Sequence, residues 1–227
     1  MELKYCIVRS SKRRKLTITV ERDRTVVVHA PANTSEEKVR QVVESKRQWI
    51  FEKMHHSQKY VDLPHPPGKE LVNGESALYL GRNYRIEIAR TDSGKIEFAQ
   101  RFLVPSDVSE RKLEAFRGWY IARAEEKILP RVRHYSHQLG VECAQTKIVD
   151  NRYRWGSCTV NNNVNFNWRL IKAPMSVIDY VVVHELTHLI EANHTPRFWN
   201  IVKAQIPNVE KPKQWLKENG QLLEHAI

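Results

Sequence analysis

The amino-acid sequence predicts an α+β protein, in which a β-rich N-terminal region with one helix (1–105) precedes a helix-dominated C-terminal region (106–227). Short runs of β-branched residues, separated by turn residues, occupy the first region and are typical of strands. Apolar residues at helical spacing dominate the second region. Strands followed by helices, without an internal repeat, are typical of the α+β class. The pattern leaves open whether the two regions are separate domains or one integrated domain.

The first region begins with a predicted β-hairpin. Leu16–Val20 and Thr25–His29 are two β-branched runs, and the polar residues 21–24 between them suit a turn. Pro31 closes the second run, because proline lacks the N–H that a strand donates.

A helix follows this hairpin. Thr34 and Glu37 have the spacing of a capping box, and apolar residues then recur at helical spacing up to about Met54. The proline-rich stretch 61–70 is typical of a linker or an ordered crossover. Because it lies inside the β-rich region, we interpret it as a poor domain boundary.

Four short strands then precede a long helix. The helix is predicted from about Asp107 to Leu139, where Gly140 ends it, and Pro130 predicts a kink or a break inside it. The strands are Ala77–Leu80, Asn83–Ala89, Lys95–Ala99 and Phe102–Val104.

The remaining elements lie in the C-terminal region. Residues Lys147–Trp168 predict two or three strands with a turn at Asn161–Asn163. Pro174 suits the first turn of a further helix. Two shorter helices are predicted at Pro196–Gln205 and Lys213–Leu223.

Composition and charge restrict the possible partners. The formal net charge of +11 favours polyanions such as nucleic acid or nucleotides, although no nucleic-acid recognition motif accompanies it and a solvated basic surface is the alternative. No apolar run approaches the roughly 20 residues of a membrane span, and the N-terminus lacks the features of a signal peptide. We therefore expect a cytoplasmic protein without a membrane partner. Cys6, Cys143 and Cys158 form no CxxC pair, so neither a disulfide framework nor a cysteine-based zinc knuckle is expected.

The stretch VVHELTHLIEANH (182–194) places three histidines and a glutamate in an apolar segment. His184 and His188 are four residues apart, so they lie on one face of the predicted helix and both rings can reach one ion. Glu185 points about 100° around the helix and stands beside that ion. This HExxH pattern is typical of zinc sites in which two neutral imidazoles bind the metal and the carboxylate takes a proton from water.

A catalytic zinc ion has three protein ligands and one open position, and His194 is the natural third ligand. Five residues separate it from His188, enough to end the helix and turn back. Glu191 stands where the metzincin pattern has glycine, so we expect Ala192–Asn193 to form the turn instead, because asparagine tolerates left-handed geometry. Zinc is the expected metal, although three imidazoles also accept other divalent ions.

Two other interpretations of this segment remain. A core helix with incidental polar residues would bury two histidines and a glutamate without partners, which is unfavourable. A closed structural zinc site would need a fourth ligand, for which Cys158 is the nearest thiol in a motif-like stretch. Glu185, directly after the first histidine, favours the open, catalytic site.

Several phrases, spread over nearly the whole chain, carry a family resemblance. They are RSSKRRKLTITV (9–20), KRQWIFEK (46–53), LGRNYRI (80–86), RYRWGSC (152–158), NFNWRLIKAP (165–174), IDYVVVHELTHL (178–189) and NHTPRFWNIV (193–202). In this order they resemble the YgjP-like metallopeptidase family, a group of metal-dependent hydrolases related to the SprT and WLM zincins. The resemblance implies a zincin-like C-terminal half, with the active-site helix beside a small sheet. It also implies zinc ligands at His184, His188 and His194 and a catalytic Glu185.

The resemblance places the RWGSC phrase on that sheet, near the cleft. Arg154, Trp155, Gly156 and Ser157 are therefore candidate substrate-binding residues. Arg154 suits a substrate carbonyl or phosphate as well as a surface acid, whereas Trp155 suits the core better than a binding platform. Gly156 indicates a close backbone approach or a bulge.

Three functions are compatible with these observations. The first is a zinc-dependent, metallopeptidase-type hydrolase that acts on a peptide or protein through Glu185-activated water. The second is a metal-dependent pyrophosphatase that splits UTP into UMP and diphosphate, an activity ascribed to some members of the family. The third is a nucleic-acid-associated binding module whose zinc is mainly structural, which the basic charge supports.

Overall fold

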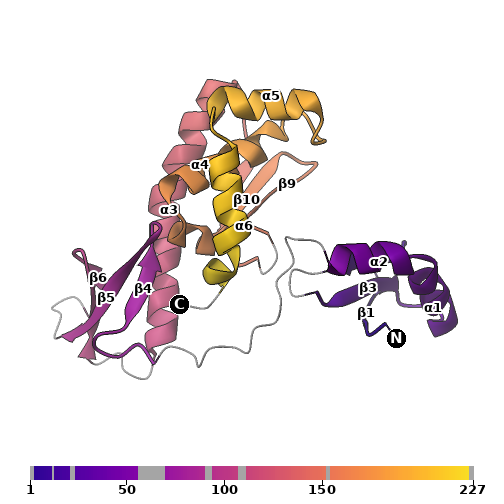
Figure 1. Ribbon diagram of the computed structural model, residues 1–227, viewed down its shortest axis with the longest axis horizontal. Coiled ribbons are helices and arrows are strands. Elements are labelled where there is room, and N and C mark those ends of the chain that lie inside the picture. Colours follow the sequence, from indigo (N-terminus) through magenta and orange to yellow (C-terminus); the bar gives the residue numbers. More distant parts are fainter. Residues whose placement is uncertain are drawn as a thin grey trace. The chain divides into compact units, whose positions relative to one another are not determined.

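The computed structural model describes residues 3–11, 13–20, 24–55, 70–89, 94–106, 111–151 and 154–224. Within these residues, helices and three small sheets form an α+β fold, which confirms the predicted class (Figure 1). The chain divides into two compact units, residues 1–67 and 68–227.

The N-terminal unit packs two short helices on a three-stranded sheet. Strand β3 lies in the middle of the sheet, parallel to β1 and antiparallel to β2. Strand β1 was not predicted, because its residues are mostly exposed and lack the alternation that a half-buried strand shows. The elements are β1 (Cys6–Ser10), β2 (Thr17–Val20), β3 (Val26–Pro31), α1 (Glu36–Ser45) and α2 (Arg47–Met54).

The single helix predicted in this unit is two helices, since the chain leaves helical geometry at Lys46. The predicted capping box at Thr34 and Glu37 is also wrong by one residue. Ser35 is the N-cap of α1, and its side-chain oxygen accepts a hydrogen bond from the backbone N–H of Lys38. Both residues are good caps, so the sequence pattern alone did not separate them.

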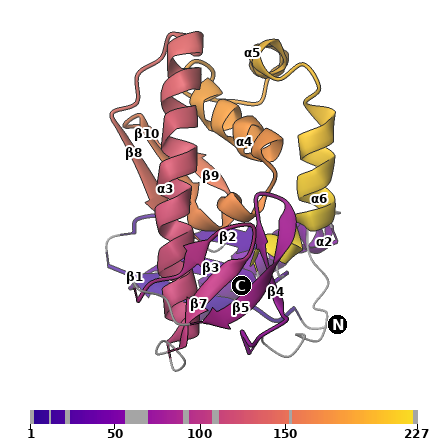
Figure 2. The same cartoon turned by 90° about the vertical axis from the view of Figure 1, so that its left-hand side faces the viewer.

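The C-terminal unit contains two sheets and the long helix α3 (Figures 1 and 2). Pro130 was predicted to kink or break helix α3, and the helix continues through it without a break. Residues 107–110, where the predicted helix began, lie outside the described residues. The sheets have the orders β4-β5-β7-β6 and β8-β10-β9. The elements are β4 (Ser76–Tyr79), β5 (Arg82–Ala89), β6 (Glu97–Phe98), β7 (Phe102–Pro105), α3 (Lys112–Leu139), β8 (Gln145–Val149), β9 (Gly156–Cys158) and β10 (Asn163–Asn167).

The division between the units differs from the predicted one at residue 105. Phe102 on β7 packs against Phe116 on α3, and the Tyr120 hydroxyl donates a 2.8 Å hydrogen bond to the carbonyl of Leu78. The second group of strands therefore shares one core with the helix that follows it. The division falls at Pro67 instead, so the interpretation of the proline-rich stretch as a poor boundary is wrong. Residues 56–69 themselves lie outside the described residues.

Helix α4 lies inside the C-terminal unit, in contact with α3, β9, β10, α5 and α6 (Figure 2). A bidentate ion pair holds it against α3: Arg131 donates from Nε to Asp179 Oδ1 at 2.6 Å and from Nη2 to Oδ2 at 2.9 Å. Its apolar residues are buried on most sides, as the sequence predicts. The elements are the 3₁₀ helix η2 (Trp168–Lys172), α4 (Met175–Thr187), α5 (Pro196–Gln205) and α6 (Glu210–Glu224).

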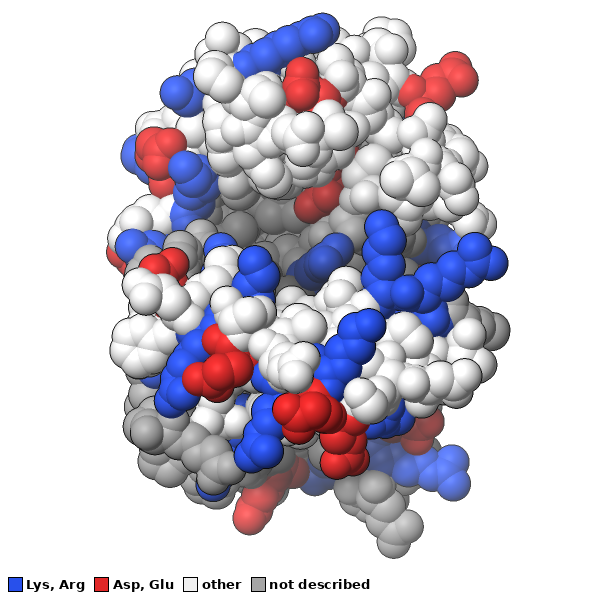
Figure 3. All heavy atoms as spheres, turned by 90° about the vertical axis from the view of Figure 1, so that its right-hand side faces the viewer, with Lys and Arg blue, Asp and Glu red and all other residues white. Residues whose placement is uncertain are grey.

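The face of the protein that Figure 3 draws carries no single continuous basic patch. Lys and Arg side chains are spread over that face, and Asp and Glu side chains lie between them. In the part of the chain that the structure describes, no helix combines the length and apolar character that crossing a bilayer requires.

Candidate metal centre

The last turns of α4 carry the first two predicted ligands. His184 lies inside the helix, and His188 is its C-cap, one residue after the last helical position. His188 keeps helical backbone angles (φ −64°, ψ −17°), so the two rings still project from one face of α4. Both side chains are half-buried, at the end of an otherwise buried helix.

Helix α5 brings the third histidine back to this face. Thr195 is the N-cap of α5, and its hydroxyl accepts a hydrogen bond from the backbone N–H of Phe198 at 3.3 Å. Pro196 begins the helix at a position where a missing N–H is tolerated. His194 precedes this cap directly, so the start of α5 fixes its place. Ala192 and Asn193 form the bend between the two helices, as predicted, and the φ of Asn193 is not positive.

The three imidazoles meet at one point. One ligand nitrogen from each of His184, His188 and His194 lies within 4.8 Å of the other two. The Nε2 atoms of His184 and His194 are 3.0 Å apart. Tetrahedral zinc with N–metal distances near 2.0–2.1 Å holds two nitrogens about 3.3 Å apart, so this spacing is close to that of two ligands of one ion.

The protonation of the rings also suits a metal. Burial lowers the pKa of His184 to about 3, with smaller contributions from His188, His194 and Lys213, so this ring is neutral near pH 7. Burial and the nearby His188 also lower the pKa of His194. Nδ1 of His188 is 3.3 Å from the carbonyl oxygen of Glu191 and must donate its proton there, which leaves Nε2 free to bind a metal.

The donor set therefore fits a divalent metal ion such as zinc, which three neutral imidazoles bind well. Cys158 does not belong to the cluster of potential ligand atoms, so among the described residues the three histidines have no fourth protein ligand. His184 departs from the usual pattern in one respect. Its Nδ1 is buried and has no hydrogen-bond partner in the described part of the chain, whereas metal-binding histidines usually have one.

Aromatic side chains of α5 form one wall of this cluster. The ring of Phe198 is buried and lies 4.7–5.0 Å from the three imidazoles, centroid to centroid. Trp199 stacks on His194 at 5.8 Å, and the ammonium of Lys213 on α6 lies 4.8 Å from the Trp199 ring centre. This wall restricts access to one side of the histidines.

The side chain of Glu185 points from α4 toward strand β9. A Cβ added to Gly156 would lie 2.5 Å from Cγ and 2.8 Å from Oε1 of Glu185. The backbone N–H of Cys158 donates to the carboxylate. Burial raises the pKa of Glu185 to about 7, although the Arg154 charge and the Cys158 hydrogen bond act in the opposite direction. The Gly156 side of β9 therefore holds Glu185 in place, and the close approach predicted from Gly156 is to this carboxylate.

The other residues of the RWGS phrase have different surroundings. Arg154 is exposed, and it is close enough to Glu185 for its charge to lower the pKa of that group. Trp155 is 8% exposed and belongs to the core, which leaves little of its ring for a substrate. Ser157 alternates to the face of β9 that points away from Glu185, and its hydroxyl accepts from Asn165 Nδ2 at 3.4 Å.

Sequence reasoning missed three residues around this site. Asn167 is buried, and its Nδ2 donates to the backbone carbonyls of Asn151 and Arg154, so it holds the loop that carries Arg154. The ring centroids of Tyr180 and His184 are 5.9 Å apart. The position of Tyr180 four residues before His184 on the helix could have indicated this contact from the sequence. Nothing in the sequence places Lys213 beside Trp199, because the two residues lie on different helices.

The chain is similar to known metallopeptidases. The family model of the YgjP-like metallopeptidase domain matches residues 14–219. Among solved structures, the metallopeptidase zymogen of Pyrococcus abyssi abylysin is 16% identical and covers 41% of this chain and 95% of its own, with a TM-score of 0.39. The metallopeptidase zymogen of Methanocaldococcus jannaschii jannalysin is 19% identical and covers 39% and 96%, with a TM-score of 0.32. No curated protein matches the sequence.

Proposed function

Because the chain belongs to the YgjP-like metallopeptidase family and is therefore a metal-dependent hydrolase, we propose that it hydrolyses peptide bonds with a zinc ion bound by His184, His188 and His194. The observation that carries this proposal is the convergence of three imidazole nitrogens within 4.8 Å, next to a buried carboxylate on the same helix. The burial of Glu185, which directly follows the first of these histidines in the helix, supports a role for it in proton transfer.

A bound zinc ion supplies a Lewis acid that polarises a carbonyl group and acidifies water. Glu185 accepts a proton from the attacking water and then returns it to the leaving amine. Its raised pKa, about 7, suits a group that takes up and gives back a proton near neutral pH. A nearby divalent cation would lower this value, because it favours the carboxylate. Gly156 and the N–H of Cys158 keep the carboxylate oriented during both transfers.

Strand β9 supports a peptide as the substrate. It is one of the two edge strands of the sheet β8-β10-β9 in the described chain, and it contacts α4, which carries the histidines. An extended peptide can add to such an edge through main-chain hydrogen bonds, which would hold its carbonyl groups in register beside the site. Recognition through the backbone would make the enzyme tolerant of the side chains of its substrate.

The test combines metal content with hydrolysis of an unfolded protein. The wild-type protein should contain one zinc ion per chain and cleave the substrate. Glu185→Gln should keep the zinc and the fold but lose at least about 100-fold of the rate, as expected for loss of a general base. His188→Ala should lose both zinc and activity. Cleavage by Glu185→Gln at the wild-type rate would exclude the proposed role of Glu185.

A second candidate reaction is hydrolysis of UTP to UMP and diphosphate. Two cations favour it: the charge of Arg154 acts on Glu185, and the charge of Lys213 acts on His184. Such cations suit the phosphates of a nucleotide, although the sequence has no P-loop. Incubation with UTP and, separately, with an unfolded protein distinguishes the reactions. A peptidase would cleave only the unfolded protein, and a UTP pyrophosphatase would cleave only UTP.

A further inference from the structure

A second concave site lies in the C-terminal unit, on elements that carry none of the histidines of the metal centre. It is a cavity of about 950 Å³ between the N-terminal half of α3 and the sheet that contains β4 and β6. This volume is within the range of cavities that bind small molecules. Figure 1 shows the sheet beside this half of α3.

Three aromatic rings form the apolar wall of the cavity. The centroid of the Tyr79 ring lies 5.0 Å from those of Phe98 and Trp119, and the latter two are 5.8 Å apart. Tyr79–Phe98 and Tyr79–Trp119 meet edge to face. Such a wall suits a flat apolar ring, which can add one more contact of the same kind.

Gly118 keeps the helical side of the cavity open. A Cβ at this position would meet no atom within 4 Å, although the residue is in the interior of a helix, where glycine is disfavoured. A larger side chain at position 118 would therefore start without a steric clash at its Cβ, but it would occupy part of the cavity that Gly118 lines.

The described side chains that line the cavity carry a net positive charge. Arg123 and Lys127 both pair with the single carboxylate of Glu126, at 2.5 Å and 3.0 Å. Lys95 and Glu97, which have opposite charges, also line the cavity. One excess positive charge therefore remains on this helix face, which suits one anionic group.

Arg123 offers a specific partner for that group. Its Nη1 pairs with Glu126, and its guanidinium lines the cavity 5.9 Å from the centre of the Trp119 ring. A guanidinium carries five N–H donors in one plane, so it can donate to a bound anion while it keeps its ion pair with Glu126. From these features, we propose that the cavity binds a small molecule that combines a flat apolar ring with one anionic group.

The test uses two dyes with the same ring system. 8-Anilino-1-naphthalenesulfonate carries one sulfonate, and N-phenyl-1-naphthylamine carries none. Fluorescence titration of the full chain should show one saturable site for the sulfonate. Its affinity should exceed that of the neutral dye by about tenfold, as expected for one charge-assisted hydrogen bond.

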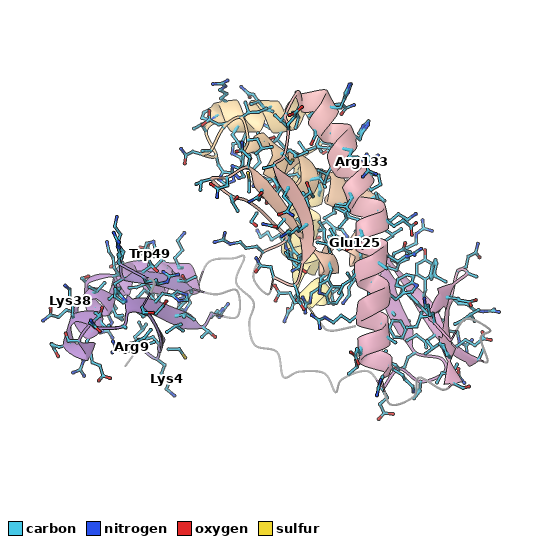
Figure 4. The ribbon with its side chains drawn as sticks, turned by 180° about the vertical axis from the view of Figure 1, so that it is seen from behind. Lys4, Arg9, Lys38, Trp49, Glu125 and Arg133 are labelled. Atoms are coloured by element: carbon cyan, nitrogen blue, oxygen red, sulfur yellow. The ribbon has the colours of Figure 1, made fainter. Side chains whose placement is uncertain are left out.

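Two variants locate the site. Gly118→Leu should abolish saturable binding of both dyes, while its melting temperature is unchanged or higher, because the helix gains a better helix former. Arg123→Gln should weaken only the sulfonate, to the level of the neutral dye. Arg133→Gln is the matched control, since Arg133 is exposed on the same helix and does not line the cavity (Figure 4). No saturable binding by the wild type, or wild-type binding by Gly118→Leu, would overturn the proposal.

Discussion

Gly156 and Glu185 are so close that a Cβ on the glycine would lie 2.5 Å from Cγ of the glutamate. Real Cβ contacts essentially never reach this distance, so any other residue at position 156 must displace the carboxylate, the strand or both. The contact links β9 to the candidate catalytic residue on α4. It gives a physical reason for glycine in the RWGSC phrase that does not depend on backbone conformation.

Gly156→Ala should therefore lower activity more than stability. We expect a loss of about 100-fold in kcat/KM, as for a catalytic group displaced by about 1 Å. The accompanying loss of folding free energy should be about 1–3 kcal/mol, typical of overpacking. Steady-state kinetics, zinc content and urea denaturation of the same preparations measure these effects. Wild-type kinetics with bound zinc would show that Glu185 does not need this contact.

Glu185→Gln should change how the metal-free protein responds to pH. The folded-state pKa of Glu185 is raised to about 7 from 4.5, so between these values the folded state binds more protons than the unfolded state. Stability from this group is present below pH 4.5 and is lost as the pH rises to 7 and above. The loss amounts to about 3 kcal/mol at most.

The variant removes this titration. In the presence of a chelator, the free energy of unfolding of Glu185→Gln should exceed that of the wild type at pH 8 by up to about 3 kcal/mol, and the difference should disappear near pH 4.5. Urea denaturation at pH 4.5, 6 and 8 measures it. If the free energies of unfolding of the two proteins instead changed with pH in parallel, Glu185 would titrate as it does in water.

Arg154→Gln should shift the pH dependence of hydrolysis. The Arg154 charge lowers the pKa of Glu185, so its removal should raise that pKa and move the acidic limb of the kcat profile to higher pH. Arg154→Lys keeps the charge and should restore most of the wild-type profile. An unchanged acidic limb in Arg154→Gln would mean that Arg154 acts only on the substrate.

Asn167→Ala should loosen the loop that carries Arg154. The buried carboxamide of Asn167 donates to two loop carbonyls and accepts from the N–H of Arg169 at 3.0 Å. Its removal takes one hydrogen-bond partner from each of these three groups and should cost about 2–4 kcal/mol of folding free energy. The exposed Asn161 provides the control Asn161→Ala, which should change stability by less than about 0.5 kcal/mol. Equal melting temperatures for both variants would contradict the role of Asn167.

The sequence predicts the histidine cluster well because its information is local. The spacing of His184 and His188 on one helix brings their rings to the same face, and His194 returns after a short turn. The surroundings of Glu185 follow from tertiary contacts instead. Gly156 and Asn167 reach the surroundings of Glu185 because β9 pairs with β10 and both strands pack on α4. The spacing of residues along the chain does not reveal these contacts.

The fold shows the same difference between local and distant information. Helix α5 has the predicted bounds, because Pro196 and its cap mark the start. Strand β1 and the division at Pro67 were missed, since both depend on partners that are distant in sequence. Pro130 did not break α3, where packing of the helix against η2 and α4 outweighs the hydrogen bond that proline removes.

The central claim is that three imidazoles share one metal ion with an open position. X-ray absorption at the zinc edge of protein loaded with one equivalent of zinc tests it most directly. We expect three nitrogen ligands at about 2.0–2.1 Å, one oxygen from solvent and no sulfur. A sulfur ligand at about 2.3 Å would mean that Cys158 closes the site as a structural centre and would contradict the proposed hydrolysis.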